Sequence, residues 1–194
     1  MGIIYFVRHG ETDWNRDRRV QGQSDTPLND AGRAQARALG TVLAPIPFQA
    51  AFSSDLIRAV ETAEIVLQGR ELTIQTPDRL RERNFGSWEG RLVSALEADG
   101  LLTGQVWPYV DAPHGGESIG DVEERAVNAM TAIAADHADE VIVVVAHGGI
   151  IRAALSAWVG IEAPIVANCG AYVIEVVDDR PRLIEHFGGN ISLS

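Results

Sequence analysis

Arginine and histidine stand side by side near the start of the chain, directly after an apolar run. Arg8 and His9 follow Ile3–Val7, and such a run predicts a buried strand. In α/β sheets, ligands bind at the carboxyl ends of the strands. We therefore expect a cation and an imidazole at the edge of the sheet where chemistry is usually carried out.

A second histidine is presented in the same way late in the chain. The apolar run Val141–Ala146 ends in His147, and Gly148 and Gly149 follow. Two glycines after a strand allow backbone amides to approach an anion closely. Two histidines at two strand ends, with an arginine beside the first, indicate a site for a tetrahedral anion.

The expected chemistry is attack on phosphorus. Neutral imidazole is a good nucleophile near neutral pH, so His9 is the candidate nucleophile, with a buried structural histidine or a metal ligand as the alternatives. Arg58 falls in the first turn of a helix expected to be capped by Ser54 or Asp55, where the helix dipole disfavours a cation by up to ~1 kcal/mol. A bound dianion would offset this cost. Because a guanidinium fork matches two phosphoryl oxygens, Arg8 and Arg58 are expected to hold the phosphoryl group.

The stretch Arg8–Thr12 resembles the signature of the histidine phosphatase superfamily, which is phosphoglycerate mutase-like. Further blocks follow in the order found in that family and span most of the chain, which makes the resemblance specific. They are Gln21-Gly22 with Asp25, Pro27-Leu28 and Gly32; Ser53–Ala59 with Thr62-Ala63; Leu80–Glu82 with Phe85-Gly86 and Trp88–Gly90; and His147–Gly149.

The resemblance implies a covalent phosphohistidine at His9, and it makes His147 a second phosphate ligand. It also implies phosphate binding by Asn15, Gln21 and Gly22 in the loop after the first motif. Gln21 can donate from its amide and Gly22 from its backbone, and an ordinary polar loop is the alternative. Gly148 is expected to offer its backbone amide to the phosphate.

Glu82 is the candidate proton donor. Ester cleavage needs a proton on the leaving oxygen, and repulsion by a bound dianion favours the acid form of a nearby carboxyl group. Glu82 could later deprotonate the water that hydrolyses the phosphohistidine. The alternative is a solvated carboxylate within the charge-rich stretch Asp78–Arg83. Glu11 and Glu89 are expected to be structural, Glu89 as a hydrogen-bond acceptor that fixes a loop.

Four further side chains are candidates for lining a substrate pocket, although the tryptophans could equally pack in the core. They are Trp14, Trp107, Tyr109 and His114. We expect no metal and no cofactor, because the carboxylates do not cluster at ligand spacing and His137 and His186 fall outside the motifs. The arginines and His147 can neutralise the phosphoryl charge that a metal would otherwise cover.

Strand and helix patterns alternate along the chain. They predict an α/β fold, a three-layer α/β/α sandwich with a mostly parallel central sheet, in a single domain over residues 1–194. Beyond the first strand, the expected strands are 51–53, 72–74, 141–146, 171–177 and 183–187, with a hairpin turn at 178–181. The expected helices are 29–43 with Asn29 as its cap, one carrying 56–66, a short one near 92–96, 119–135 and 150–159.

Composition excludes several classes of function. The net charge of −11 argues against nucleic acid, whose binding needs a basic face. No apolar segment reaches the roughly 18 residues of a membrane span, and the first residues lack the pattern of a signal peptide. Cys169 is the single cysteine, so an intrachain disulfide is impossible. We expect a cytoplasmic protein that acts on a small molecule, with a homodimer left open.

The choice of reaction rests on where the cations are. All 16 basic residues are arginines, and none lies between Arg91 and Arg125. We expect a pocket that is open to water and not built for a second strong anion, unless an arginine from elsewhere reaches in. This favours hydrolysis of a small phosphomonoester. The alternatives are phosphoryl transfer of the phosphoglycerate mutase type and a non-catalytic module that binds phosphate or phosphopeptides.

Overall fold

The computed structural model describes residues 1–102, 115–162 and 166–188, which build a central sheet between two layers of helices. The strands of the sheet lie in the order β3-β2-β4-β1-β5-β6. Their bounds are β1 Gly2–Arg8, β2 Ala50–Ser53, β3 Ile74–Gln75, β4 Val141–Ala146, β5 Ala171–Val177 and β6 Arg180–Phe187. The helices are α1 Asp13–Arg16, α2 Asp30–Leu43, α3 Ile57–Val66, α4 Val93–Ala98, α5 Ile119–Asp136 and α6 Gly148–Ala154, with short 3₁₀ turns at Asp78–Leu80 and Gly86–Trp88.

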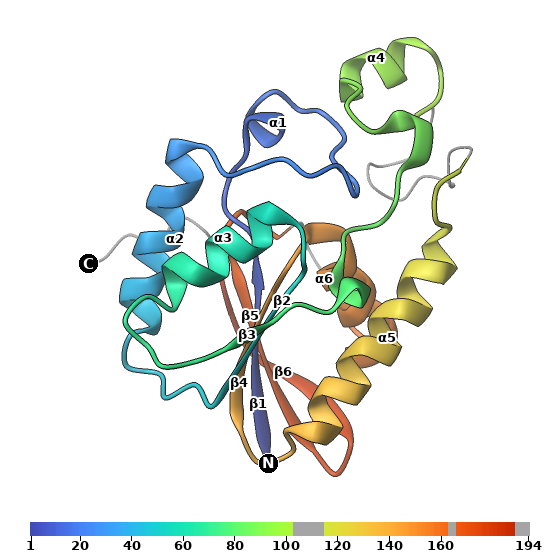
Figure 1. The fold of residues 1–194 in the computed structure, drawn as a ribbon. Coiled ribbons are helices and arrows are strands. Elements are labelled where there is room, and N and C mark those ends of the chain that lie inside the picture. The colour runs from blue at the N-terminus through green and yellow to red at the C-terminus, as the bar shows by residue number, and fades with distance from the viewer. Residues whose placement is uncertain (103–114, 163–165, 189–194) are drawn as a thin grey trace.

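The sheet is parallel except at one edge. Strands β3, β2, β4 and β1 pair in parallel, whereas β5 pairs antiparallel with β1 and β6 antiparallel with β5. Helices α2 and α3 cover one face of this sheet and α5 and α6 the other (Figure 1). The predicted three-layer α/β/α sandwich with a mostly parallel sheet is confirmed.

Alternate residues of the buried strands supply the two hydrophobic cores. In β4, Ile142 and Val144 pack with α5 and α6, whereas Val143 and Val145 pack with α2 and α3. All four side chains are buried, as expected for a strand covered on both faces. Because both faces are fixed in this way, the register of the central strands is also fixed.

That register brings the two histidines together. Arg8 lies opposite Ala146 in the parallel pair of β1 and β4, and the backbone amide of His9 donates to the carbonyl of Ala146 at 2.9 Å. His9 and His147 therefore leave the sheet at the same edge. In Figure 1, α1 and the loop that follows it lie over this carboxyl edge.

Several element boundaries differ from the sequence-based expectation. Strand β3 is only two residues long, and the last strand begins at Arg180, because Asp178 and Asp179 alone form the hairpin turn with positive φ angles. The expected helix 150–159 begins at Gly148 and passes into a π-helical turn at Leu155–Val159. Asn29 caps α2 as expected, accepting from the amide of Gly32 at 2.8 Å.

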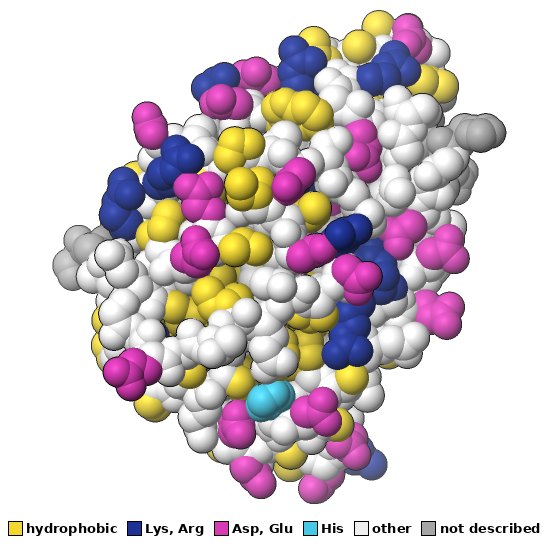
Figure 2. All heavy atoms as spheres, viewed as in Figure 1, with side chains coloured by type: hydrophobic (Ala, Val, Ile, Leu, Met, Phe, Trp, Pro, Cys, Tyr) yellow, Lys and Arg dark blue, Asp and Glu magenta, His cyan; other side chains and the backbone are white. Residues whose placement is uncertain are grey.

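The surface carries acidic and basic side chains interspersed over the face seen in Figure 2, in keeping with the many ion pairs described below. Within residues 1–102, 115–162 and 166–188, no helix combines the length and the hydrophobicity needed to cross a bilayer.

Candidate active site

His9 is held in one orientation by the residue that follows it. Its Nδ1 lies 2.7 Å from the carbonyl oxygen of Gly10. A carbonyl can only accept, so Nδ1 carries the hydrogen, and Nε2 of the neutral ring keeps its lone pair. The amide of Gly10 in turn donates to the hydroxyl of Thr62 at 3.0 Å, which fixes the peptide that orients the ring. His9 is 2% exposed and lines a cavity of about 140 Å³.

His147 lies beside His9, with the two ring centroids 5.1 Å apart. It is fully buried, but it is not among the described residues that line the cavity. Gly148, the next residue, does line the cavity, and a Cβ on it would lie 3.5 Å from Nε of Arg8. The guanidinium of Arg8 donates to the carbonyl of Val166 and borders the same cavity.

Arg58 is buried in the first turn of α3, as predicted. Its Nη1 donates to the carbonyl of Ser24 at 2.8 Å and its Nη2 to that of Gly22 at 2.7 Å. These bonds tie the guanidinium to the loop that holds Gly22, and Arg58 borders the cavity. A side chain at position 22 is excluded because φ is +54° and a Cβ would lie 2.0 Å from the carboxylate of Glu89.

The expected capping of this helix by Ser54 or Asp55 is corrected in part. The N-cap position is Leu56, whose amide donates to Oγ of Ser54 at 3.3 Å, while the amide of Ile57 donates to the carboxylate of Asp25 at 2.7 Å. Asp55 instead forms an ion pair with Arg81. Asp25 thus caps α3 from a distant loop and stabilises the helix end that carries Arg58.

Glu82 is docked against the start of α6. Its Oε2 accepts from the amide of Gly149 at 3.0 Å, and its Oε1 accepts from the amide of Arg83 at 2.8 Å. A Cβ at position 149 would lie 2.2 Å from Oε1 of Glu82, so only glycine permits this approach. Glu82 lines the same cavity as His9.

The other residues of the first loop have mixed roles. Asn15 and Gln21 line the cavity, but the side-chain oxygen of each is already engaged: that of Asn15 accepts from Thr12 and that of Gln21 from Thr12 and Thr26. The amide nitrogens of Asn15 and Gln21 are the groups left to meet an anion. The structural expectation for Glu89 fits its contacts, which are the amides of residues 23 and 85 and the hydroxyl of residue 24, and Glu11 accepts from the side chain of residue 29.

Sequence reasoning missed residues that border this cavity. Arg19 comes from the loop after α1 and Arg152 from α6, and Phe85, Gly149 and Val166 complete the lining. The sequence predicts a pocket that does not suit a second strong anion unless an arginine from elsewhere reaches in, and the structure meets this exception because Arg19 and Arg152 border the cavity. Of the candidates for the substrate pocket, Trp14 contacts Gly90 and is absent from the described lining. Trp107, Tyr109 and His114 fall outside the described residues.

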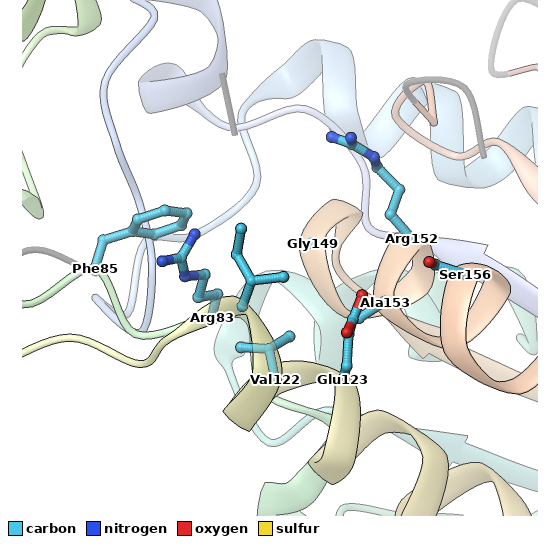
Figure 3. Close-up of a pocket in the computed structure, with 9 residues that line it drawn as sticks. Arg83, Phe85, Val122, Glu123, Gly149, Arg152, Ala153 and Ser156 are labelled. Carbon is cyan, nitrogen blue, oxygen red and sulfur yellow. The ribbon is translucent and has the colours of Figure 1, made fainter. Parts of the chain in front are cut away.

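A smaller recess of about 50 Å³ adjoins the cavity between α5 and α6 (Figure 3). Phe85, Gly149 and Arg152 border both spaces. The Arg83 guanidinium lies 5.1 Å from the centre of the Phe85 ring, and Arg152 points away from Glu123 in Figure 3. The remaining walls are mostly apolar, so this recess suits the carbon skeleton of a ligand rather than a phosphate.

Burial and positive charge shape the electrostatics of the site. Burial, then the charges of Arg58 and Arg8, hold the pKa of His9 well below its usual value. Burial and the neighbouring Arg58 do the same to the pKa of His147. Burial also lowers the pKa of Arg58, to about 10, which still leaves this side chain charged at neutral pH. The site thus combines two neutral imidazoles with permanent cations.

These lowered pKa values predict a loss of stability in mild acid. The folded protein keeps His9 and His147 neutral, whereas the unfolded chain binds protons near pH 6.5, so the unfolded state holds more protons as the pH falls below that value. As the pH falls below 6.5, each histidine should lower the free energy of unfolding by up to about 1.4 kcal/mol per pH unit, until the pH reaches its pKa in the folded protein. Urea unfolding of the wild type and of the His9→Gln/His147→Gln double variant at pH 7.5, 6.5 and 5.5 measures this. Equal pH slopes in both proteins would contradict it.

Metal ligands do not gather here. Across the residues that the structure describes, no group of three histidine, cysteine or carboxylate side chains is arranged to hold a metal ion. Cys169, whose amide donates to the carbonyl of Arg8 at 3.1 Å, is buried, and burial raises the pKa of its thiol to about 12. Neither observation offers a soft or multidentate metal site.

Comparison with known proteins agrees with this geometry. The chain is 38% identical over 183 residues to a glucosyl-3-phosphoglycerate phosphatase of Mycolicibacterium vanbaalenii, covering 86% of this chain and 80% of that protein. It is 38% identical over 162 residues to a metal-independent phosphoserine phosphatase of Arabidopsis thaliana, covering 77% and 66%. The solved structure of Bacillus stearothermophilus YhfR superposes with a TM-score of 0.88 at 33% identity, covering 99% of this chain and 98% of that one.

Both relatives named above are phosphatases, which agrees with the prediction that this chain is a phosphoric monoester hydrolase. The sequence profile of the histidine phosphatase superfamily, branch 1, matches residues 4–187, a span that contains His9, His147 and all the described residues that line the cavity. By its sequence blocks, its fold and this match, the chain belongs to branch 1 of the histidine phosphatase superfamily.

Proposed function

We propose that this protein is a metal-independent phosphomonoesterase that acts on a small phosphorylated metabolite through a phosphohistidine at His9, with Glu82 as proton donor. The observation that carries the proposal is a set of buried nitrogens around His9. Among the described residues, Nε of Arg8, Nε of Arg58 and both ring nitrogens of His147 have no hydrogen-bond partner. Buried polar atoms are normally paired, and the oxygens of a phosphoryl group would accept from the two arginine nitrogens and from the ring nitrogen of His147 that carries hydrogen.

In the first step, the lone pair on Nε2 of His9 attacks phosphorus and the bond to the ester oxygen breaks. The Gly10 carbonyl supports this step because it accepts from Nδ1, where positive charge develops as the N–P bond forms. Arg8 and Arg58 stabilise the phosphoryl oxygens. Glu82 gives its proton to the leaving oxygen, so that an alcohol departs rather than an alkoxide.

In the second step, water replaces the alcohol. The carboxylate of Glu82 takes a proton from this water, whose oxygen attacks phosphorus as the bond to Nε2 breaks and phosphate is released. The amides of Gly149 and Arg83 hold the carboxylate in place through both steps. Neither of these two reaction steps requires a cofactor. We infer that residues 1–194 form one catalytic domain.

The substrate class is proposed from the relatives, which act on glucosyl-3-phosphoglycerate and on phosphoserine according to their names. Release of inorganic phosphate from a panel of sugar phosphates, phosphoserine and phosphoglycerate derivatives tests this. Turnover of at least one member supports a metabolite phosphatase. Binding of phosphate or a phosphopeptide without turnover of any ester would favour the non-catalytic module.

Phosphoryl transfer remains the second candidate, because Arg19 and Arg152 supply cations that the sequence-based preference for hydrolysis assumed to be absent. A mutase must hold its phosphorylated intermediate and exclude water while the group moves. We expect a coupled assay from 3-phosphoglycerate to 2-phosphoglycerate to run slower than phosphate release by the same preparation. Isomerisation faster than hydrolysis of every ester tried would reverse this choice.

We expect full activity after treatment with EDTA and removal of the chelator. The arginines are proposed to neutralise the phosphoryl charge, and the described residues contain no group of side chains arranged to hold a metal ion. Phosphate release should be the same before and after chelation to within the error of the assay. Activity that is lost on chelation and restored by one divalent ion would contradict the mechanism.

A further inference from the structure

The cavity around His9 holds more positive charge than one phosphoryl group needs. Arg8, Arg19, Arg58 and Arg152 all line it, and Glu82 is the single carboxylate in the described part of its wall. A phosphomonoester carries about two negative charges at neutral pH. The guanidinium groups of Arg8 and Arg58 already match that charge, which leaves two further arginines to explain.

Elsewhere in the described structure, arginines are commonly paired with carboxylates, which are abundant in a chain of net charge −11. By contrast, Arg8, Arg19 and Arg58 have no carboxylate within 4 Å among the described residues, although Figure 2 shows acidic side chains beside basic ones over much of the surface. Arg8, Arg19 and Arg58 therefore bring positive charge to the cavity that no described carboxylate pairs with directly. The paired arginines are Arg16, Arg33, Arg81, Arg91, Arg125 and Arg182.

Arg19 and Arg152 also enter the cavity from different elements than the other two. Arg8 and Arg58 are near enough to lower the pKa of His9, and their guanidinium groups donate to backbone carbonyls. Arg19 is anchored through Nη1 to the carbonyl of Gly90 at 3.0 Å, which leaves the rest of its guanidinium fork to a ligand. Arg152 is 8% exposed and also borders the apolar recess.

We propose, resting on the phosphomonoesterase activity above, that Arg19 and Arg152 form a second anion subsite that binds a carboxylate of the substrate. A carboxylate matches the planar fork of a guanidinium, and burial strengthens the resulting charge-assisted hydrogen bonds. The substrate class is then a phosphorylated hydroxy acid, with its phosphate at His9 and its carboxylate at Arg19 and Arg152. The cations come from the loop after α1 and from α6, and not from the segment that follows Glu82.

A matched pair of substrates isolates the carboxylate. 3-Phosphoglycerate and glycerol 3-phosphate share a three-carbon skeleton with a terminal phosphate, and they differ in a carboxylate against a hydroxymethyl group. We expect the wild type to prefer 3-phosphoglycerate in kcat/KM by about tenfold or more, since hydrogen bonds to charged groups contribute that much. Hydrolysis of glycerol 3-phosphate with no preference for the carboxylate would overturn the subsite and leave the proposed function standing. Turnover of other panel members but of neither ester in this pair would also overturn the subsite, whereas no hydrolysis of these esters, of p-nitrophenyl phosphate or of any panel member would overturn the proposed function.

Variants assign the preference to the two arginines. Arg19→Gln and Arg152→Gln should each lower the kcat/KM ratio of the two esters by about tenfold, mainly through KM for 3-phosphoglycerate. The matched control is Arg18→Gln, which removes the same charge from the adjacent, exposed position of the same loop and should keep the wild-type ratio. Arg152 is nearly buried, so Arg152→Lys, which keeps the charge but not the planar fork, gives a second measurement at this position if Arg152→Gln does not fold.

An unchanged ratio in the Arg19 and Arg152 variants would overturn the proposal, as would an equal loss on both esters, which would mean a general effect on folding or on the phosphate. A ratio that falls to the same extent in Arg18→Gln would also overturn it, because long-range charge would then explain the preference without a subsite.

Discussion

Replacing His9 by alanine should abolish phosphate release from every phosphomonoester. The imidazole is proposed to form the covalent bond to phosphorus, and His9 is the single histidine among the described residues that line the cavity. Removing a nucleophile typically costs several orders of magnitude in kcat, so we expect a loss of at least about 10³-fold. The measurement is kcat with p-nitrophenyl phosphate and with the best metabolite found in the panel.

The matched control for this variant is His186→Ala. His186 is an exposed imidazole on β6 that stacks on Tyr172, at 5.7 Å between ring centroids, and it is not part of the cavity. Its removal should leave kcat within about twofold of the wild type. Residual activity of His9→Ala above about one per cent of wild type would count against a nucleophilic role.

Glu82→Gln should slow esters with poor leaving groups far more than p-nitrophenyl phosphate. Glutamine keeps the shape but has no carboxyl proton to give, and it can accept from only one of the two amides that hold the carboxylate. An alkoxide needs that proton, whereas nitrophenolate leaves readily without it. We expect a loss of about 10²–10⁴-fold on an alkyl phosphate and a much smaller one on the nitrophenyl ester.

Gly149→Ala provides an independent approach to the same group, because the new Cβ would lie 2.2 Å from Oε1 of Glu82 and must displace it. It should reproduce the leaving-group dependence of Glu82→Gln without altering Glu82 itself. Glu123→Gln is the control, since this half-buried carboxylate borders only the apolar recess. Equal losses on both classes of ester in Glu82→Gln would remove Glu82 from the role of acid.

The fold and the convergence of the two histidines could be predicted from the sequence. Continuous apolar runs such as Val141–Ala146 indicate strands buried on both faces, and parallel strands end at a common edge. Those two rules are sufficient to place His9 and His147 close together. The position of Arg58 in the first turn of its helix could also be predicted, because polar residues just before the helix mark where it starts.

Contacts between distant loops could not be predicted from local patterns. Asp25 caps α3 from 32 residues away, and Glu82 docks on Gly149 from 67 residues away. Neither pairing leaves a periodic signal in the sequence. The sequence does hold a weak signal for Arg152, which lies one helical turn after Gly148 and therefore on the same face of α6. The helix expected from the sequence began at residue 150, so it did not include Gly148 and did not show this relation.

The stereochemical course at phosphorus tests the central claim, a covalent phosphohistidine, most directly. A thiophosphate ester made chiral with oxygen isotopes is hydrolysed in isotopically labelled water, and the configuration of the released thiophosphate is determined. Each in-line displacement inverts phosphorus, so attack by His9 followed by attack by water gives net retention. We predict retention, whether or not the intermediate accumulates. Net inversion would mean that water attacks the ester directly and would contradict the account.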